Sequence, residues 1–135
     1  MKKINYIDVN ELNPLNFDSI IDVRSPAEFT EDHIPNSVNF PVLSDLERGE
    51  VGTLYKSLSP FEARKVGGAL IAENVANHIK NVLSNNNESW RPLIYCWRGG
   101  QRSKAFATIL NEVGWCVSVV EGGSAYFNAR DDICA

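Results

Sequence analysis

The sequence predicts an α/β fold with a central, mostly parallel five-stranded sheet flanked by helices. Short β-branched runs alternate along the chain with helical patterns, which is typical of parallel sheets. Two Ser-Pro-x-Glu sequences predict helix starts, because they form capping boxes with proline at the first helical position. Cys96 ends an apolar run at the carboxyl end of a predicted strand, which is where ligands bind in such sheets.

Five strands are expected from short apolar runs. The runs SIIDVR, PLIYC and CVSVV are bounded by polar residues, which is typical of buried strands. A stretch near the N-terminus and another after the sequence HIPN complete the set. The expected strands lie around Ile4–Val9, Ser19–Arg24, Val38–Phe40, Pro92–Cys96 and Cys116–Val120.

Three helices are expected between these strands. Two follow the Ser-Pro-x-Glu boxes, in which serine is the N-cap and glutamate the third helical residue. The third ends before Gly114, which suits the position just beyond a helix. The expected helices run from Pro26 to about Asp32, from Ser59 to about Leu83 and from Arg102 to Val113.

The longest of these helices has apolar residues at helical spacing, and we expect them to pack on the sheet. The segment before it, Leu43–Leu58, is expected to be an irregular connection with some helix. The predicted apolar face comprises Val66, Ala69, Leu70, Val75, Ala76, Ile79, Val82 and Leu83.

The 135 residues fit one domain, residues 1–135, with the composition of a globular protein. The net charge of −4 gives no general footprint for nucleic acid or an anionic membrane. The window Trp90–Asn111 nevertheless has a charge of +4, so the remainder carries −8 (−4 minus +4). Its basic residues surround a cysteine, which favours an anion site: Arg91, Arg98, Arg102 and Lys104.

Three cysteines without CxxC spacing make a disulfide framework or a zinc site unexpected. Cys116 and Cys134 are interpreted as a core residue and a tail residue. The N-terminus lacks the apolar core of a signal peptide, and no apolar run reaches membrane-spanning length. These features predict a soluble cytoplasmic protein with reduced thiols, no membrane partner, no metal and no cofactor.

The segment Cys96–Arg102 has the pattern Cys-x5-Arg. Its glycines allow backbone N–H groups to turn inward as an anion-binding nest, and the following helix adds its positive dipole end. Arg102 can bind an oxyanion with two N–H groups, while Arg98 adds charge at the rim. This setting favours a cysteine thiolate, so Cys96 is the predicted nucleophile or carrier of a charged group.

The loop alone leaves three chemistries open. One is phosphate-ester cleavage through a cysteinyl phosphate, for which Asp22, Asp32 and Asp45 are available as general acids. Another is sulfur or selenium transfer through a persulfide or perselenide. A third is anion binding without catalysis.

The motif IIDVRSPAEFTEDHIPNSVNFPV resembles the first half of a rhodanese domain, YCWRGGQRS its active-site loop, and VVEGG the strand and turn that follow. The resemblance implies structural roles for Asp22 and Arg24, and implies that Glu28 and His33 anchor the segment after the first helix. The family often has glycine at two other positions. Here these two positions are Asp32 and Asn36. Asparagine tolerates a left-handed backbone better than aspartate does.

Two features narrow the resemblance. Common single-domain rhodaneses have a loop one residue shorter, and the segment Leu46–Leu70 resembles the insert of the tRNA 2-selenouridine synthases. That family replaces sulfur by selenium in the wobble 2-thiouridine of tRNA, using selenophosphate. The resemblance implies that Cys96 carries or delivers the selenium. The candidate site is therefore Cys96 as the catalytic residue, with Trp97, Arg98, Gly99, Gly100, Gln101, Arg102 and Ser103 as substrate- or anion-binding residues.

The family's P-loop domain has no counterpart here, because no glycine is followed by lysine as a Walker A motif requires. The chain is therefore expected to be a fragment, a truncated gene product or a stand-alone rhodanese unit. Its expected partners are a small anionic donor, selenophosphate or thiosulfate, and tRNA in a full-length protein. The alternatives are a stand-alone thiosulfate-type sulfurtransferase, a Cys-x5-Arg phosphatase and a non-catalytic anion-binding module.

Overall fold

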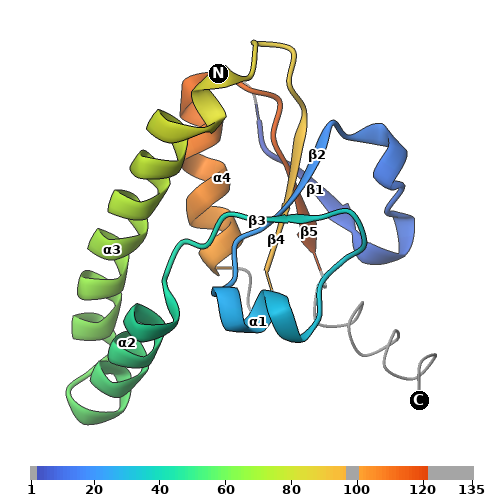
Figure 1. The fold of residues 1–135 in the computed structure, drawn as a ribbon. Coiled ribbons are helices and arrows are strands. Elements are labelled where there is room, and N and C mark those ends of the chain that lie inside the picture. Colours follow the sequence, from blue (N-terminus) through green and yellow to red (C-terminus); the bar gives the residue numbers. More distant parts are fainter. Residues whose placement is uncertain (1–2, 97–100, 122–135) are drawn as a thin grey trace, which may run out of the picture.

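A computed structural model describes residues 3–96 and 101–121, and it contains a five-stranded sheet in the order β1-β5-β4-β2-β3 (Figure 1). All of its strand pairs are parallel, which confirms the predicted α/β class. The strands in chain order are β1 (Asn5–Asp8), β2 (Ser19–Asp22), β3 (Val38–Asn39), β4 (Pro92–Tyr95) and β5 (Ser118–Glu121).

The register brings apolar residues of neighbouring strands into rows across the sheet. Ile21 of β2 pairs with Ile94 of β4, which pairs with Val119 of β5. All three belong to the larger core, together with Cys96, and this core is completed by the helices on the same face. Neighbouring positions of β2, β4 and β5 point to the other face, where Ile20, Leu93, Tyr95 and Val120 form a second, smaller core. Ile34, from the segment between α1 and β3, completes it.

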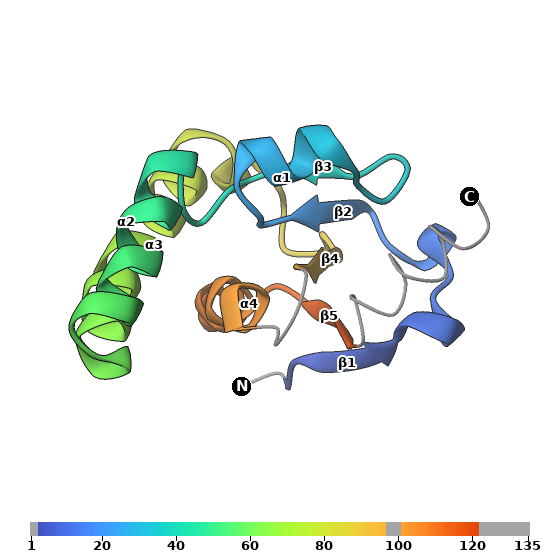
Figure 2. The same cartoon turned by 90° about the horizontal axis from the view of Figure 1, so that it is seen from below.

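Four α-helices surround the sheet. Figure 2 shows α3 and α4 on the same side of it, with α2 packed along α3. The apolar residues Phe106 and Leu110 of α4 are fully buried in the larger core, as the helical pattern predicted. The helices are α1 (Pro26–Glu31), α2 (Asp45–Ser57), α3 (Pro60–Asn81) and α4 (Gln101–Val113), and short 3-10 turns lie at Val9–Glu11, Pro14–Asn16 and Leu83–Asn85.

The prediction for Leu43–Leu58, an irregular connection with some helix, is right about the helix and wrong about the irregular connection, because α2 is a continuous helix through most of it. Ser44 opens this helix with a capping box: its hydroxyl accepts the Glu47 N–H at 3.1 Å, and Glu47 Oε1 accepts the Ser44 N–H at 2.8 Å. No residue of α2 is buried, so the helix lacks the apolar stripe that reveals a helix in a sequence.

Two details of α3 also differ from the prediction. The Ser59 hydroxyl accepts the Glu62 N–H, but the Glu62 carboxylate bonds to Lys65 at 2.9 Å instead of completing a capping box. The buried positions of α3 are Ala63, Gly67 and Val75. The predicted face is confirmed for Leu70, Val75, Ile79 and Leu83, which pack in or against the larger core. It is wrong for the other four, which are exposed: Val66, Ala69, Ala76 and Val82.

The two positions at which the family often has glycine differ in conformation. Asn36 has a φ of +69°, in the left-handed region that asparagine tolerates. Asp32 has a φ of −165°, which is extended backbone open to any residue. The turn after α1 therefore forms without glycine. Within the described part of the chain, no helix is long and apolar enough to cross a membrane.

Candidate functional site

Cys96 directly follows β4, at the edge of the sheet where β2 also ends. Its side chain belongs to the larger core and is 4% exposed. The Cys96 Sγ atom lies 3.2 Å from the Oγ atom of Ser103, which is buried in the first turn of α4. The parallel sheet thus places the predicted nucleophile against the start of a helix, as the strand-loop-helix pattern indicated.

The predicted anion-binding residues divide into two groups. Gln101 and Arg102 are the first residues of α4; Gln101 is exposed and Arg102 is half-buried. Ser103 faces the cysteine. The remaining four lie outside the described residues, and their roles stay predictions: Trp97, Arg98, Gly99 and Gly100.

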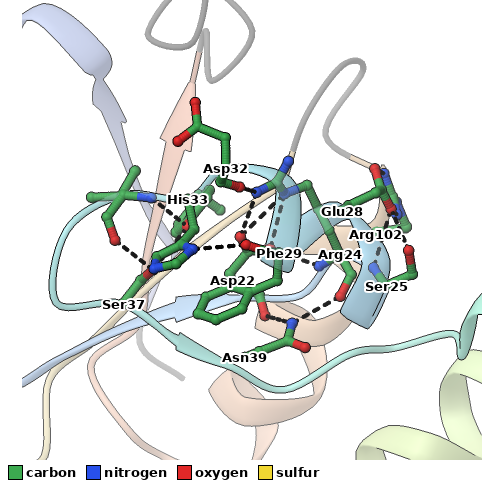
Figure 3. Close-up of polar contacts among 12 residues, drawn as sticks. Asp22, Arg24, Ser25, Glu28, Phe29, Asp32, His33, Ser37, Asn39 and Arg102 are labelled. Atoms are coloured by element: carbon green, nitrogen blue, oxygen red, sulfur yellow. Dashed lines mark hydrogen bonds and ion pairs between the residues drawn. The ribbon is translucent and has the colours of Figure 1, made fainter. Parts of the chain in front are cut away.

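Arg102 is bound to Glu28 of α1 (Figure 3). Its Nη1 atom donates to Glu28 Oε1 at 2.7 Å, and its Nη2 atom donates to Oε2 at 3.3 Å. The Ser25 backbone N–H and hydroxyl donate to Oε1 at 3.1 and 3.0 Å, and Arg48 Nε of α2 lies 3.3 Å from the same oxygen. Burial disfavours ionisation of Glu28, but the hydrogen bonds and charge of Arg102, with the Ser25 donors, outweigh it and lower the pKa of Glu28 to about 2.

Glu28 therefore does more than the resemblance implied. It completes the predicted capping box at Ser25, and it also joins α1 to the start of α4 and to α2. A guanidinium has five N–H donors, so the two bonds to Glu28 orient Arg102 without using all of its donors. His33 contacts its own segment: Nδ1 lies 2.7 Å from the Phe29 carbonyl oxygen and the two rings stack.

Asp22 and Arg24 form a buried ion pair beside this cluster, as Figure 3 shows. Arg24 Nη2 donates to Asp22 Oδ2 at 2.8 Å, and Nη2 also donates to the Asp32 carbonyl oxygen. Asn39 closes the arrangement by donating to the Asp22 and Arg24 carbonyl oxygens at 3.0 and 2.9 Å. Burial acts to lower the pKa of Arg24, but the bond and charge of Asp22 outweigh it and raise that pKa. These contacts hold the chain between β2 and α1 in place, which is a structural role.

A cavity of about 720 Å³ lies between α2, α3 and the first residues of α4; we call it the α2–α3 cavity. Gln101 and Arg102 line it on the side of the candidate site. The sequence does not predict this cavity, because the cavity needs two continuous helices side by side and only α3 is predicted as one. Glycines within each helix were the available signal. They are Gly49 and Gly52 in α2, and Gly67 and Gly68 in α3.

A parallel α/β sheet with a cysteine at the carboxyl end of a strand defines a class of protein, and comparison with known proteins names its family. The chain belongs to the rhodanese-like domain family, whose model matches residues 8–130. It is similar to the tRNA 2-selenouridine synthases of Psychromonas ingrahamii (36% identity, covering 77% of this chain and 28% of the relative) and Nitrosomonas europaea (38% identity, covering 82% and 29%). The chain thus spans less than a third of the length of these relatives.

Solved structures agree with this assignment. The N-terminal domain of a putative ATP/GTP binding protein from Clostridium difficile 630 superposes with a TM-score of 0.74 at 32% identity, covering 97% of this chain and all of that domain. A rhodanese-related protein from Thermoplasma volcanium has a TM-score of 0.54 at 18% identity, covering 87% of this chain and 84% of that one, which supports the fold. The resemblance of the sequence to rhodaneses and to the selenouridine synthases is confirmed.

Proposed function

We propose that this chain is a sulfur- or selenium-transfer module in which Cys96 is the nucleophile. The observation that carries the proposal is the contact of 3.2 Å between Cys96 Sγ and Ser103 Oγ at the carboxyl edge of the sheet. A hydroxyl in this position can donate to a thiolate, and Arg102 in the preceding position is held by Glu28 to bind an anionic donor.

Thiosulfate illustrates the transfer step. The Cys96 thiolate attacks the outer sulfur of the donor, a new S–S bond forms, and the S–S bond of thiosulfate breaks. Sulfite leaves with the electron pair of that bond, and a Cys96 persulfide remains. The step needs no added oxidant or reductant, because the outer sulfur is already at the oxidation level at which it is transferred.

Phosphate hydrolysis fits the described residues less well. A phosphatase needs a general acid at the leaving oxygen. Of the candidate acids, Asp22 is fully buried against Arg24, and an Asp45 carboxylate oxygen accepts the Ala27 N–H at 3.0 Å. Both contacts count against Asp22 and Asp45 as the general acid of a phosphatase, which leaves Asp32 as the remaining candidate acid.

The names of the relatives support selenium transfer to tRNA. Proteins named tRNA 2-selenouridine synthase are 36% and 38% identical to this chain. We propose that the chain performs the transfer half-reaction of such an activity in the cytoplasm, with selenophosphate as the donor and tRNA as the acceptor in a full-length protein.

A parallel assay of two reactions tests the proposal. We expect the chain to form thiocyanate from thiosulfate and cyanide, and Cys96→Ser to abolish this activity. Cys116→Ser is the matched control and should keep the activity. Cys116 lies after α4 and just before β5, whereas Cys96 lies before α4. Hydrolysis of an aryl phosphate that depends on Cys96, without thiocyanate formation, would support the phosphatase and contradict the proposal.

A further inference from the structure

Four glycines line the α2–α3 cavity, and for three of them the fold does not require glycine. A Cβ atom built on Gly49, Gly52 or Gly68 meets no atom within 4 Å, and none of the three has the positive φ that favours glycine. Gly67 is the one of the four whose Cβ would touch another side chain, at 3.4 Å from Val51 Cγ1 of α2, which is an ordinary van der Waals contact. Glycine destabilises a helix interior relative to alanine. What the three glycines provide is open space in the cavity.

The charges around the cavity favour an anion. Three arginines and one aspartate line it: Arg48, Arg64, Arg102 and Asp45. Two of the arginines, Arg48 and Arg102, are also paired with Glu28, so Arg64 adds the charge that this carboxylate does not balance. Arg64 is exposed and makes no ion pair or hydrogen bond through its side chain with any other residue that the structure describes. Its guanidinium is therefore available to a ligand, and guanidinium groups bind phosphate with two parallel N–H donors.

The walls between these charges favour a flat apolar group. Val51 and Ile71 line the cavity together with the glycines, and Tyr55, which is 56% exposed, adds an aromatic ring. Helix surfaces without side chains let a planar ring approach the backbone, and an aromatic side chain stacks on such a ring. The volume of about 720 Å³ lies within the range of small-molecule sites.

We propose that the α2–α3 cavity binds a phosphate ester of a flat ring, of about nucleotide size, with its ring against Tyr55 and the glycines and its phosphate on the arginines. Arg102 lines the cavity and precedes Ser103, which contacts Cys96 Sγ, so the phosphate end of the ligand lies on the side of the candidate site. The role of this ligand as the acceptor rests on the proposed function, whereas its binding does not.

Binding is tested by nuclear magnetic resonance titration of the 135-residue chain, without any sulfur or selenium donor. The probes are phenyl phosphate, hexyl phosphate with the same number of carbon atoms, adenosine monophosphate and inorganic phosphate. We expect phenyl phosphate and adenosine monophosphate to shift the amide signals of Gly49, Gly52 and Gly68 saturably. Their affinity should exceed that of hexyl phosphate and inorganic phosphate by about tenfold or more.

Three variants locate the binding. Gly68→Leu fills the cavity and should weaken phenyl phosphate binding by about tenfold. Ala76→Leu places the same side chain at an exposed position of α3 outside the cavity and should bind like the wild type. Arg64→Gln removes one exposed charge and should therefore fold normally, even if Gly68→Leu does not. It should weaken binding by about tenfold.

The inference is overturned if the glycine amides show no saturable shift, if hexyl phosphate binds as tightly as phenyl phosphate, if adenosine monophosphate does not enter, or if Arg64→Gln binds like the wild type. Cys96→Ser is titrated alongside and should bind normally. A failure of Cys96 to accept sulfur would contradict the proposed function alone, so the two proposals fail separately.

Discussion

The Arg102 guanidinium and the Glu28 carboxylate form a two-point ion pair across 74 residues of sequence, with N–O distances of 2.7 and 3.3 Å. Each residue belongs to a helix that follows a strand of the parallel sheet, α1 after β2 and α4 after β4. The two strands are neighbours, so their carboxyl ends bring the helix starts together. The pair therefore connects the end of the cysteine loop to the rest of the fold.

Glu28→Gln should remove a pH-dependent part of the stability. The pKa of Glu28 is lowered from 4.5 to about 2 in the folded chain, so its ionised form stabilises the fold above pH 4.5, and this contribution is lost as the pH falls towards 2. We expect the variant to be less stable by about 2 kcal/mol at pH 7, allowing for partial exposure to solvent, with the difference shrinking below pH 4. Urea unfolding at several pH values measures it.

Glu31→Gln is the control for this prediction, because Glu31 is an exposed carboxylate of the same helix. It should unfold like the wild type. A stability difference for Glu28→Gln that is equal at pH 7 and near pH 2 would show that the ionised carboxylate is not the source of the effect.

Ser103→Ala should make Cys96 less reactive. The hydroxyl lies 3.2 Å from Cys96 Sγ and can donate to the thiolate, so its removal costs the thiolate about 1 kcal/mol, or about fivefold in the rate of alkylation at neutral pH. Peptide mass spectrometry after iodoacetamide treatment follows each cysteine. Cys116 is an internal control whose rate should not change, and an unaltered Cys96 rate would exclude a role for the hydroxyl.

Alanine should have opposite effects at two glycines. Gly52→Ala adds a Cβ into open space within α2, so it should raise the free energy of unfolding by about 0.5–1 kcal/mol. Gly114→Ala should lower it by about 1–3 kcal/mol, because Gly114 has a φ of +115° after α4. Thermal and denaturant unfolding compare the two, and destabilisation by Gly52→Ala would mean that the helix needs glycine there.

Tyr95→Phe should lower the free energy of unfolding and should leave the Cys96 side chain unchanged. The buried Tyr95 hydroxyl accepts the Ile34 N–H at 3.0 Å and lies 3.0 Å from Ser37 Oγ. Removing it leaves the Ile34 N–H buried without this partner, at a cost of about 1–3 kcal/mol in denaturant unfolding. Tyr6→Phe changes a tyrosine that is 48% exposed and should have no effect. Equal stabilities of the two variants would contradict the role of the Tyr95 hydroxyl.

Local patterns were enough to predict the strands and three of the helices. The runs around Ile21 and Ile94 are buried on both faces of the sheet, so their composition marks them as strands. Helix α2 was expected only as some helix within an irregular connection, for the opposite reason. It buries no residue and contains two glycines. The capping box between Ser44 and Glu47 is the local pattern that indicates its start.

The candidate site was predictable as far as one segment of chain determines it. Cys96 and Ser103 belong to a single strand-loop-helix unit, and the parallel sheet places that unit at a ligand-binding edge. The pairing of Arg102 with Glu28 depends on two helices brought together by the sheet, and the α2–α3 cavity depends on how two helices pack. Such relationships arise from tertiary structure, and the glycines within α2 and α3 are the local signal that the cavity leaves in the sequence.

The central claim is that Cys96 itself takes up the transferred atom, and peptide mass spectrometry after incubation with thiosulfate tests it most directly. Wild type and Cys116→Ser should carry one added sulfur on the peptide containing Cys96, removable by a thiol reductant, and Cys96→Ser should carry none. Selenophosphate is tested alongside as the selenium donor. Unmodified Cys96 with both donors, in a chain shown to be folded, would contradict the account.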